Sequence, residues 1–117
     1  MEILQPPGWP RPRGYSNGIS ASGRLVVTGG LVGWNGQEEF PHKDMAGQAR
    51  LAFENIAAVL TEGRAKPEHM VRMTWYITSK SEYLSSIKDI GGSYRDVFGK
   101  NFPAMAVVEV SALMEDD

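Results

Sequence analysis

The strongest constraint on the fold is a helical repeat of apolar residues in the middle of the chain. Between Met45 and Leu60, apolar side chains recur every three or four positions, which is the spacing of one face of an α-helix. Asp44 stands before this run in the position of an N-cap, and Gly63 follows it as a stop signal. The sequence therefore predicts an amphipathic helix of about 18 residues, one face of which must pack on another layer.

Runs with the alternation of β-strands lie on either side of a second helical repeat. The first run, residues 70–78, reads MVRMTWYIT and is rich in β-forming residues. A second helix follows, and we expect Ser81 to cap its start and Gly99 to end it. The last run, residues 102–110, reads FPAMAVVEV and alternates after its proline. These patterns predict a strand, a helix and a final strand.

The N-terminal part is divided by turn-forming residues. The motif PPGWPRPRG contains four prolines and two glycines, so we expect residues 1–13 to form an extended arm. Strands are predicted at residues 16–21 and 24–32, joined by a turn at residues 22–23.

The predicted order is thus β-β-α-β-α-β in one domain of 117 residues. Two helices on one face of a mixed sheet give an α+β fold with one open sheet face. We expect that face to carry apolar side chains: Met73, Trp75 or Tyr76, Met105 and Val107. Because such a face is too apolar for water, the pattern predicts an oligomer built on the open side of the sheet.

Composition narrows the functional classes. The net charge is −2, which makes nucleic acid a poor default partner. The chain has no cysteine, so disulfides and thiol catalysis are excluded. The sequence contains no apolar run long enough to span a membrane, and its N-terminus does not resemble a signal peptide. We therefore expect a soluble, cytoplasmic protein without a membrane partner.

Few residues suggest chemistry by themselves. His42 and His69 are far apart with no third ligand at metal spacing, and the glycine-rich GGLVGWNG lacks a phosphate-loop pattern, so no metal or cofactor is expected. Arg13, with Arg11, is either a solvated part of the arm or an anion clamp. Glu109, a lone acid in an apolar strand, is either an ion-pair partner across a subunit contact or a general base.

Three segments together resemble the RidA/YjgF/UK114 family of imine and enamine deaminases. They read RGYSNGISASGRLVVTGGLVGW, DMAGQARLAFENIAAVLTEGRAKPEHMVRMTWYI and YRDVFGKNFPAMAVVEVSAL. The resemblance implies a chorismate-mutase-like fold and a homotrimer with pockets at its subunit interfaces. It also implies hydrolysis of 2-imino or enamine acids to 2-oxo acids and ammonia, which needs a held carboxylate, a placed water and a proton relay.

The resemblance assigns site positions residue by residue. It places the pocket tyrosine of the family on Tyr15 and the hydroxyl residue that ends the second strand on Thr28. The following backbone amide falls on Gly29, and a position that is usually Gln falls on Gly30. The helix asparagine falls on Gly91.

The last strand supplies the remaining implied positions. The water-holding backbone carbonyl falls on Val107, and the carboxylate-binding arginine falls on Met105. Methionine cannot form the paired, charge-assisted bonds of a guanidinium, so we expect weaker binding of 2-imino acids by roughly tenfold to a hundredfold. Arg13, together with Arg11, is the candidate substitute for anion binding.

Three functions remain open from the sequence. The first is a divergent deaminase that acts on a small imine or enamine. The second is a non-catalytic, small-molecule-binding or regulatory trimer, which the methionine at position 105 motivates. The third, a ribonuclease, has the least support, because the net charge is negative and no paired histidines are present.

Overall fold

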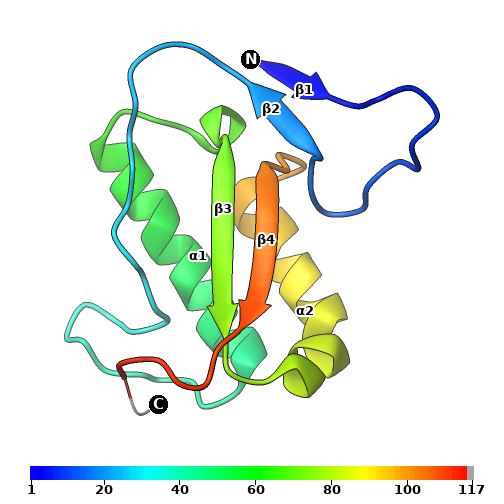
Figure 1. Ribbon diagram of the computed structural model, residues 1–117. Coiled ribbons are helices and arrows are strands. Elements are labelled where there is room, and N and C mark those ends of the chain that lie inside the picture. The colour runs from blue at the N-terminus through cyan, green and yellow to red at the C-terminus, as the bar shows by residue number, and fades with distance from the viewer. Residues whose placement is uncertain (116–117) are drawn as a thin grey trace.

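The chain forms two strands, a helix, a strand, a second helix and a last strand, as predicted (Figure 1). The computed structural model describes residues 1–115. The elements are β1 (Glu2–Leu4), β2 (Gly18–Ser20), α1 (Met45–Glu62), a short 3-10 helix (Pro67–His69), β3 (Arg72–Ile77), α2 (Lys80–Phe98) and β4 (Ala104–Glu109). β1 and β2 pair antiparallel, and β3 and β4 pair parallel, so the strands form two small sheets. The α+β class is confirmed, and so is the order from α1 to β4, but the single mixed sheet is replaced by two small sheets and β1 lies in the predicted arm.

Local capping residues set the ends of both helices. The Asp44 side chain accepts a hydrogen bond from the Gly47 N–H at 3.1 Å, and α1 ends at Gly63, as predicted. The predicted cap of α2 is wrong by two residues. Ser79, and not Ser81, accepts the hydrogen bond from the first turn of α2. No helix in residues 1–115 is both long enough and apolar enough to cross a membrane.

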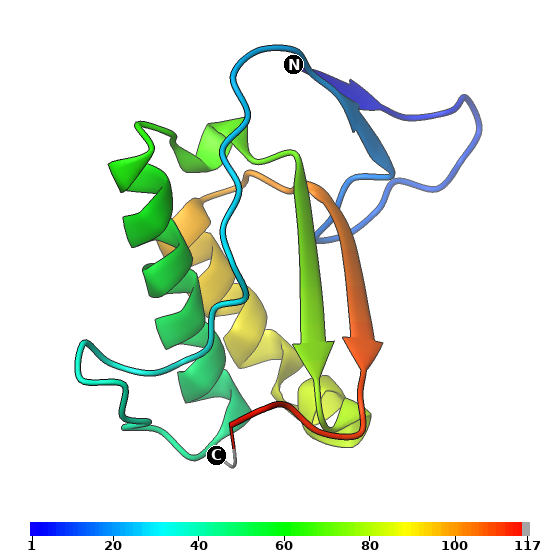
Figure 2. The same cartoon turned by 60° about the vertical axis from the view of Figure 1, so that its left-hand side comes forward.

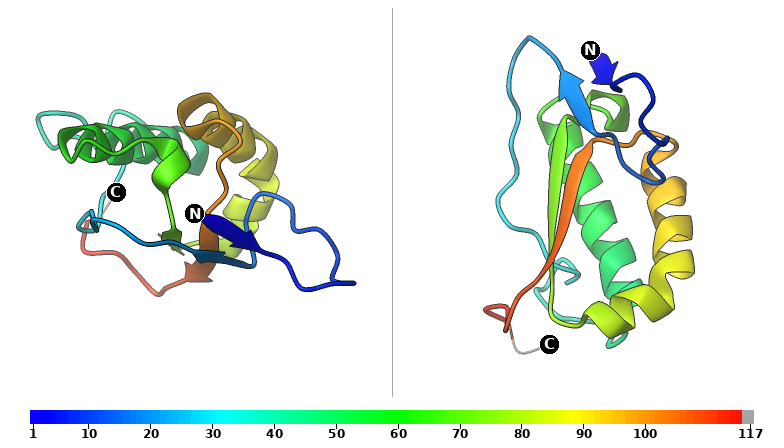
Figure 3. Two further views of the ribbon diagram at one scale, coloured as in Figure 1. Left: turned by 90° about the horizontal axis from the view of Figure 1, so that it is seen from above. Right: turned by 45° about the vertical axis from the view of Figure 1, so that its right-hand side comes forward.

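The predicted strand at residues 24–32 is not a strand in the described chain. β2 pairs instead with β1, which lies within the segment predicted to be an unpaired arm. Figures 2 and 3 show the segment between β2 and α1 running extended beside β3, on the side away from β4. Its alternation leaves Leu25 and Val27 with 81% and 74% of their surface exposed. Alternation identified an extended backbone here, but it does not specify a hydrogen-bonding partner.

Polar groups of and near α1 hold this extended segment in place. The Asn55 side-chain amide donates to the carbonyls of Val32 and Trp34 at 2.9 and 3.0 Å. At the other end, the Arg24 guanidinium donates to the carbonyl of Gly63 at 2.7 Å. The segment is therefore attached to the helix layer, although it runs beside a strand.

The core lies between the helices and the β3–β4 sheet. Its buried residues are Phe53 from α1 and Ile90, Tyr94 and Phe98 from α2. The Phe53 ring packs at centroid distances of 5.3 Å from Trp75 and 5.5 Å from Tyr94. Both helices cover the same face of the sheet (Figure 3).

The prediction of which sheet face packs on the helices is wrong, and the face expected to be open is the one that the helices cover. Met73, Trp75 and Met105, expected on the open face, pack against the core. Tyr76 and Val108, which are paired in the register, lie on the open face with 59% and 40% of their surface exposed. The reason is volume, because the gap between a sheet and a helix layer must be filled to crystal-like density. Large side chains fill it, and the small alanines of β4 alternate to the outside.

Candidate functional site

A pocket of about 310 Å³ lies between the β3–β4 sheet and α2, next to residues 13–15 of the N-terminal segment. Its volume is at the lower end of the range for small-molecule sites. Val107, also predicted on the open sheet face, lines this pocket on the inner side together with Met105. The sheet face that the sequence assigned to a subunit contact thus forms a wall of the cavity.

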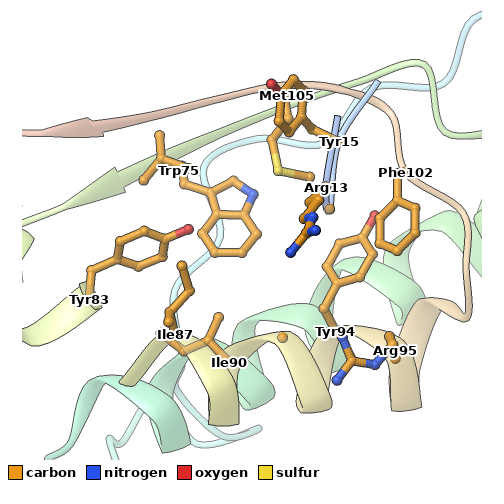
Figure 4. A pocket seen from close by; sticks show the side chains of 13 residues that line it. Arg13, Tyr15, Trp75, Tyr83, Ile87, Ile90, Tyr94, Arg95, Phe102 and Met105 are labelled. Carbon is orange, nitrogen blue, oxygen red and sulfur yellow. The ribbon is translucent and has the colours of Figure 1, made fainter. Parts of the chain in front are cut away.

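Aromatic rings form most of the wall of the pocket (Figure 4). Tyr94 and Phe102 stack with their ring centroids 5.5 Å apart and their planes 13° apart. Trp75 and Tyr83 meet edge to face at 6.0 Å. Since these rings pack on one another, the pocket presents a stiff apolar surface rather than a set of mobile side chains.

Two arginines, Arg13 and Arg95, provide the charge of the pocket, and no acidic residue lines it. Within residues 1–115, neither guanidinium makes an ion pair or a hydrogen bond. Figure 4 shows the Arg13 guanidinium directed into the pocket between Trp75 and Tyr94. The site is therefore electropositive and suited to an anion. The same residues contain no group of three acidic or histidine side chains that could hold a metal ion.

The polar groups of the aromatic wall differ in whether they can still donate a hydrogen bond to a ligand. Burial raises the pKa of Tyr94 well above its usual range, and its hydroxyl donates to the backbone carbonyl of Asn101. Burial also raises the pKa of Tyr83, which keeps this phenol neutral. The Trp75 indole N–H is buried and has no acceptor among the described residues. Tyr94 is thus committed to the fold, whereas Tyr83 and Trp75 keep a donor for a ligand.

Four of the sequence-predicted site residues meet in this pocket. They are Arg13, Tyr15, Met105 and Val107. Gly91, the position that the family resemblance assigned to a helix asparagine, lines the same cavity from α2. Their chemical roles remain predictions, but their convergence from three separate parts of the chain is a property of the fold.

Ser16 fixes the N-terminal segment next to β4. It is buried, its N–H donates to the Pro103 carbonyl at 3.0 Å, and its hydroxyl donates to the carbonyl of Phe102. This two-point attachment places the preceding residues, Arg13 and Tyr15, at the edge of the pocket.

The other four predicted site residues lie outside this pocket. Thr28, Gly29 and Gly30 belong to the extended segment beside β3 and do not line the cavity. Glu109 is exposed, and its carboxylate accepts the backbone N–H of Lys80 at 2.6 Å. In the described chain, Glu109 therefore ties the end of β4 to the start of α2.

Apart from Gly91, the sequence analysis did not place the residues of α2, or Trp75, in the site. Tyr83, Ile87 and Arg95 line the pocket, and the first two recur at helical spacing. Ile87 belongs to the apolar repeat of this helix, and such a repeat usually marks the face that packs on the core. The signal that could have revealed the site is the width of the apolar face of α2, because this face covers both the core and the cavity.

The sequence profile of the family described as Endoribonuclease L-PSP matches residues 10–117. A RutC family protein of Pyrococcus abyssi is 30% identical over 108 residues, which are 92% of this chain and 82% of the relative. A 2-iminobutanoate/2-iminopropanoate deaminase of Escherichia coli K12 is 25% identical over 105 residues, covering 87% of this chain and 78% of the relative.

Solved structures share the fold described above. A protein of the conserved Rid family from Yersinia pestis, YyfB, superposes with a TM-score of 0.74 at 27% identity, covering 88% of this chain and 78% of that one. This chain therefore belongs to the RidA/YjgF family and has its fold.

Proposed function

We propose that this protein hydrolyses an imine or enamine of a small carboxylic acid to a carbonyl product and ammonia. The observation that carries the proposal is the unpaired Arg13 guanidinium beside Tyr15, in a pocket with no acidic lining residue. Membership in the RidA/YjgF family supports it, because an E. coli relative is named a 2-iminobutanoate/2-iminopropanoate deaminase. The proposed reaction needs no more than positioning and proton transfer, which this pocket can supply.

The chemistry begins with a protonated imine, whose carbon is already electrophilic. Water forms a new C–O bond to that carbon, and a proton from the water passes to the nitrogen. The C–N bond then breaks, and its electron pair leaves with ammonia while a second proton moves from oxygen to nitrogen. One iminium acid and one water give one 2-oxo acid and one ammonium ion.

We assign a role to each of two lining side chains. The Arg13 guanidinium pairs with the substrate carboxylate through two parallel N–H···O bonds. The Tyr15 hydroxyl orients the attacking water and relays its proton. Holding both reactants in one geometry removes most of the entropic part of the barrier.

The backbone of β4 offers a third group. Ala104 and Val110 donate their N–H groups to carbonyls at the two ends of β3, so the backbone groups of alternate residues point to β3. The carbonyl of Val107 therefore points to the free edge of β4, where it can accept a hydrogen bond from the water.

A second candidate function is small-molecule binding without catalysis. Met105 stands where the family resemblance implies the carboxylate-binding arginine, and Thr28 and Gly29 lie outside the pocket. A chain with this arrangement could bind a ligand and still lack the groups that move protons. It would then be stabilised by the ligand and release no ammonia.

The test is ammonia release from imino acids made in the assay by an amino-acid oxidase, measured against spontaneous hydrolysis in buffer. Tyr15→Phe should lower the rate about a hundredfold or more, the usual contribution of a positioned proton-transfer group. Tyr76→Phe removes the same hydroxyl from the opposite face of the sheet and should leave the rate unchanged. No turnover over a broad panel, with RNA as one member, would reject catalysis and leave the binding function.

We further propose that the protein is a homotrimer with its pockets at the subunit interfaces. Support comes from the exposed apolar side chains of Leu25, Val27, Tyr76 and Val108, on or beside the β3–β4 sheet. Light scattering coupled to size-exclusion chromatography should give three times the chain mass. The double variant Val27→Lys with Tyr76→Lys should give the monomer mass, and a monomeric wild type would refute the assembly.

A further inference from the structure

We infer that the ligand of this pocket is a carboxylate with an aromatic or similarly bulky apolar body. Its carboxylate pairs with Arg13, and its body lies between Trp75, Tyr83 and Ile87. The inference rests on the proposed function, because it assigns a substrate class to the same pocket. It concerns which imino or enamine acid is bound, and not whether one is hydrolysed.

Charge identifies one end of the ligand. Arg13 enters the pocket from the N-terminal segment, and Arg95 lines it from α2, with its guanidinium lying beside the helix near Tyr94 (Figure 4). Neither has an acidic partner in residues 1–115, and no lining residue is acidic. A guanidinium fork matches the two oxygens of a carboxylate, and both exposed arginines can reach a ligand that enters from solvent. The ligand therefore carries an anionic group at this end.

The indole of Trp75 points to the same end. Its N–H is buried without an acceptor among the described residues, which is an unfavourable state that an oxygen atom would relieve. In Figure 4 the indole nitrogen lies on the side of the ring that faces Arg13. The buried Trp75 donor and the exposed Arg13 guanidinium, from different elements, thus face the same part of the cavity, as they would around one carboxylate.

The rest of the pocket offers no charged group to a small substrate. Its walls there are the rings of Trp75 and Tyr83 and the side chains of Ile87 and Ile90, with the Tyr83 hydroxyl as a neutral polar group. A substrate with a side chain of one or two carbons leaves these surfaces in water, whereas a phenyl ring covers them. Burying such a ring contributes about as much as burying a phenylalanine side chain, enough for roughly a tenfold to hundredfold gain in affinity.

Two lining positions make room for that body. Gly91 has no side chain, and a Cβ built there meets only the Arg95 guanidinium, at 3.5 Å. Met105 contributes a flexible apolar chain that adapts to the shape of a ligand. The cavity of about 310 Å³ lies where these positions and the aromatic wall meet.

The experiment is calorimetric titration with 3-phenylpropanoate, an unreactive carboxylate, compared with propanoate and with 3-phenylpropanamide. We expect 3-phenylpropanoate to bind at least about tenfold more tightly than either, because propanoate lacks the ring and the amide lacks the charge. Arg13→Gln should weaken its binding by about tenfold to a hundredfold. Arg11→Gln is the matched control, since Arg11 is in the same arm but does not line the pocket.

The inference is overturned if propanoate binds as tightly as 3-phenylpropanoate, or if the Arg11 and Arg13 variants behave alike. Turnover of the imino acids of alanine and phenylalanine separates this inference from the proposed function. Tight aromatic binding without ammonia release would reject catalysis and retain the ligand class. Ammonia release from both imino acids at equal efficiency would retain catalysis and reject the ligand class.

Discussion

Gly91 and Gly92 are neighbours in the interior of α2, but they face different surroundings. A Cβ at position 91 would meet the Arg95 guanidinium at an ordinary contact distance of 3.5 Å, and one at position 92 would meet no described atom within 4 Å. Glycine inside a helix is about 0.8–1 kcal/mol less favourable than alanine. Each glycine-to-alanine change should therefore raise the free energy of unfolding by about 0.5–1 kcal/mol, or the melting temperature by roughly 2–6 °C.

Larger side chains at the same two positions test which side of α2 lines the ligand site. A saturating ligand at about 100 times its Kd adds about 2.7 kcal/mol to the stability of the folded state. With 3-phenylpropanoate, thermal unfolding followed by circular dichroism should show this shift in the wild type and in Gly92→Leu. Gly91→Leu should lose most of it, because only Gly91 lines the pocket.

Two results would refute this reasoning. If Gly91→Ala lowers the melting temperature while Gly92→Ala raises it, position 91 is closely packed and the cavity is not open there. If both leucine variants keep the full ligand shift, α2 does not form a wall of the binding site.

Three further predictions test the core, a helix cap and the pH dependence of stability. Phe53→Ala should lower stability by about 3–5 kcal/mol in urea unfolding, and Leu84→Ala, at a side chain that is 53% exposed, by less than about 0.5; equal losses would contradict the assigned core. Ser79→Ala should lower stability by about 1 kcal/mol and Ser81→Ala by almost nothing, and the reverse order would make Ser81 the cap. Because burial raises the pKa of Tyr94 above its ordinary value of 10.0, stability should be unaffected by this group below pH 10.0 and should fall at higher pH, where the unfolded chain loses the proton first. Tyr94→Phe should flatten that alkaline decline in the urea midpoint, and an unchanged slope would assign the decline to other groups.

Features set by neighbouring residues could be predicted from the sequence. Asp44, Gly63 and Gly99 mark helix ends because capping depends on the backbone within one turn. The error at Ser79 has the same origin, since two serines stand close together and both suit a cap. The residues next to an element indicate whether it is a helix or a strand, but they do not determine the residue at which it begins.

Features that depend on tertiary packing could not be predicted from the sequence. Alternation in β4 gives two faces, but whether Met105 or Val108 is inside depends on the volume that the helices leave. The pairing of β2 with β1 likewise depends on where the arm returns. Arg13 and Tyr15 were candidates from the sequence, while Tyr83 and Arg95 became site residues only when α2 was placed beside them.

Two hydrogen bonds tie together the elements from which the pocket is built. The Glu109 carboxylate accepts from the Lys80 N–H, and the Tyr94 hydroxyl donates to the carbonyl of Asn101. Strand and helix therefore cannot slide or spread without breaking a bond. In such a cavity, a new substrate range arises by exchange of single side chains on a fixed frame, and residues such as Met105 can change during evolution while the backbone stays the same.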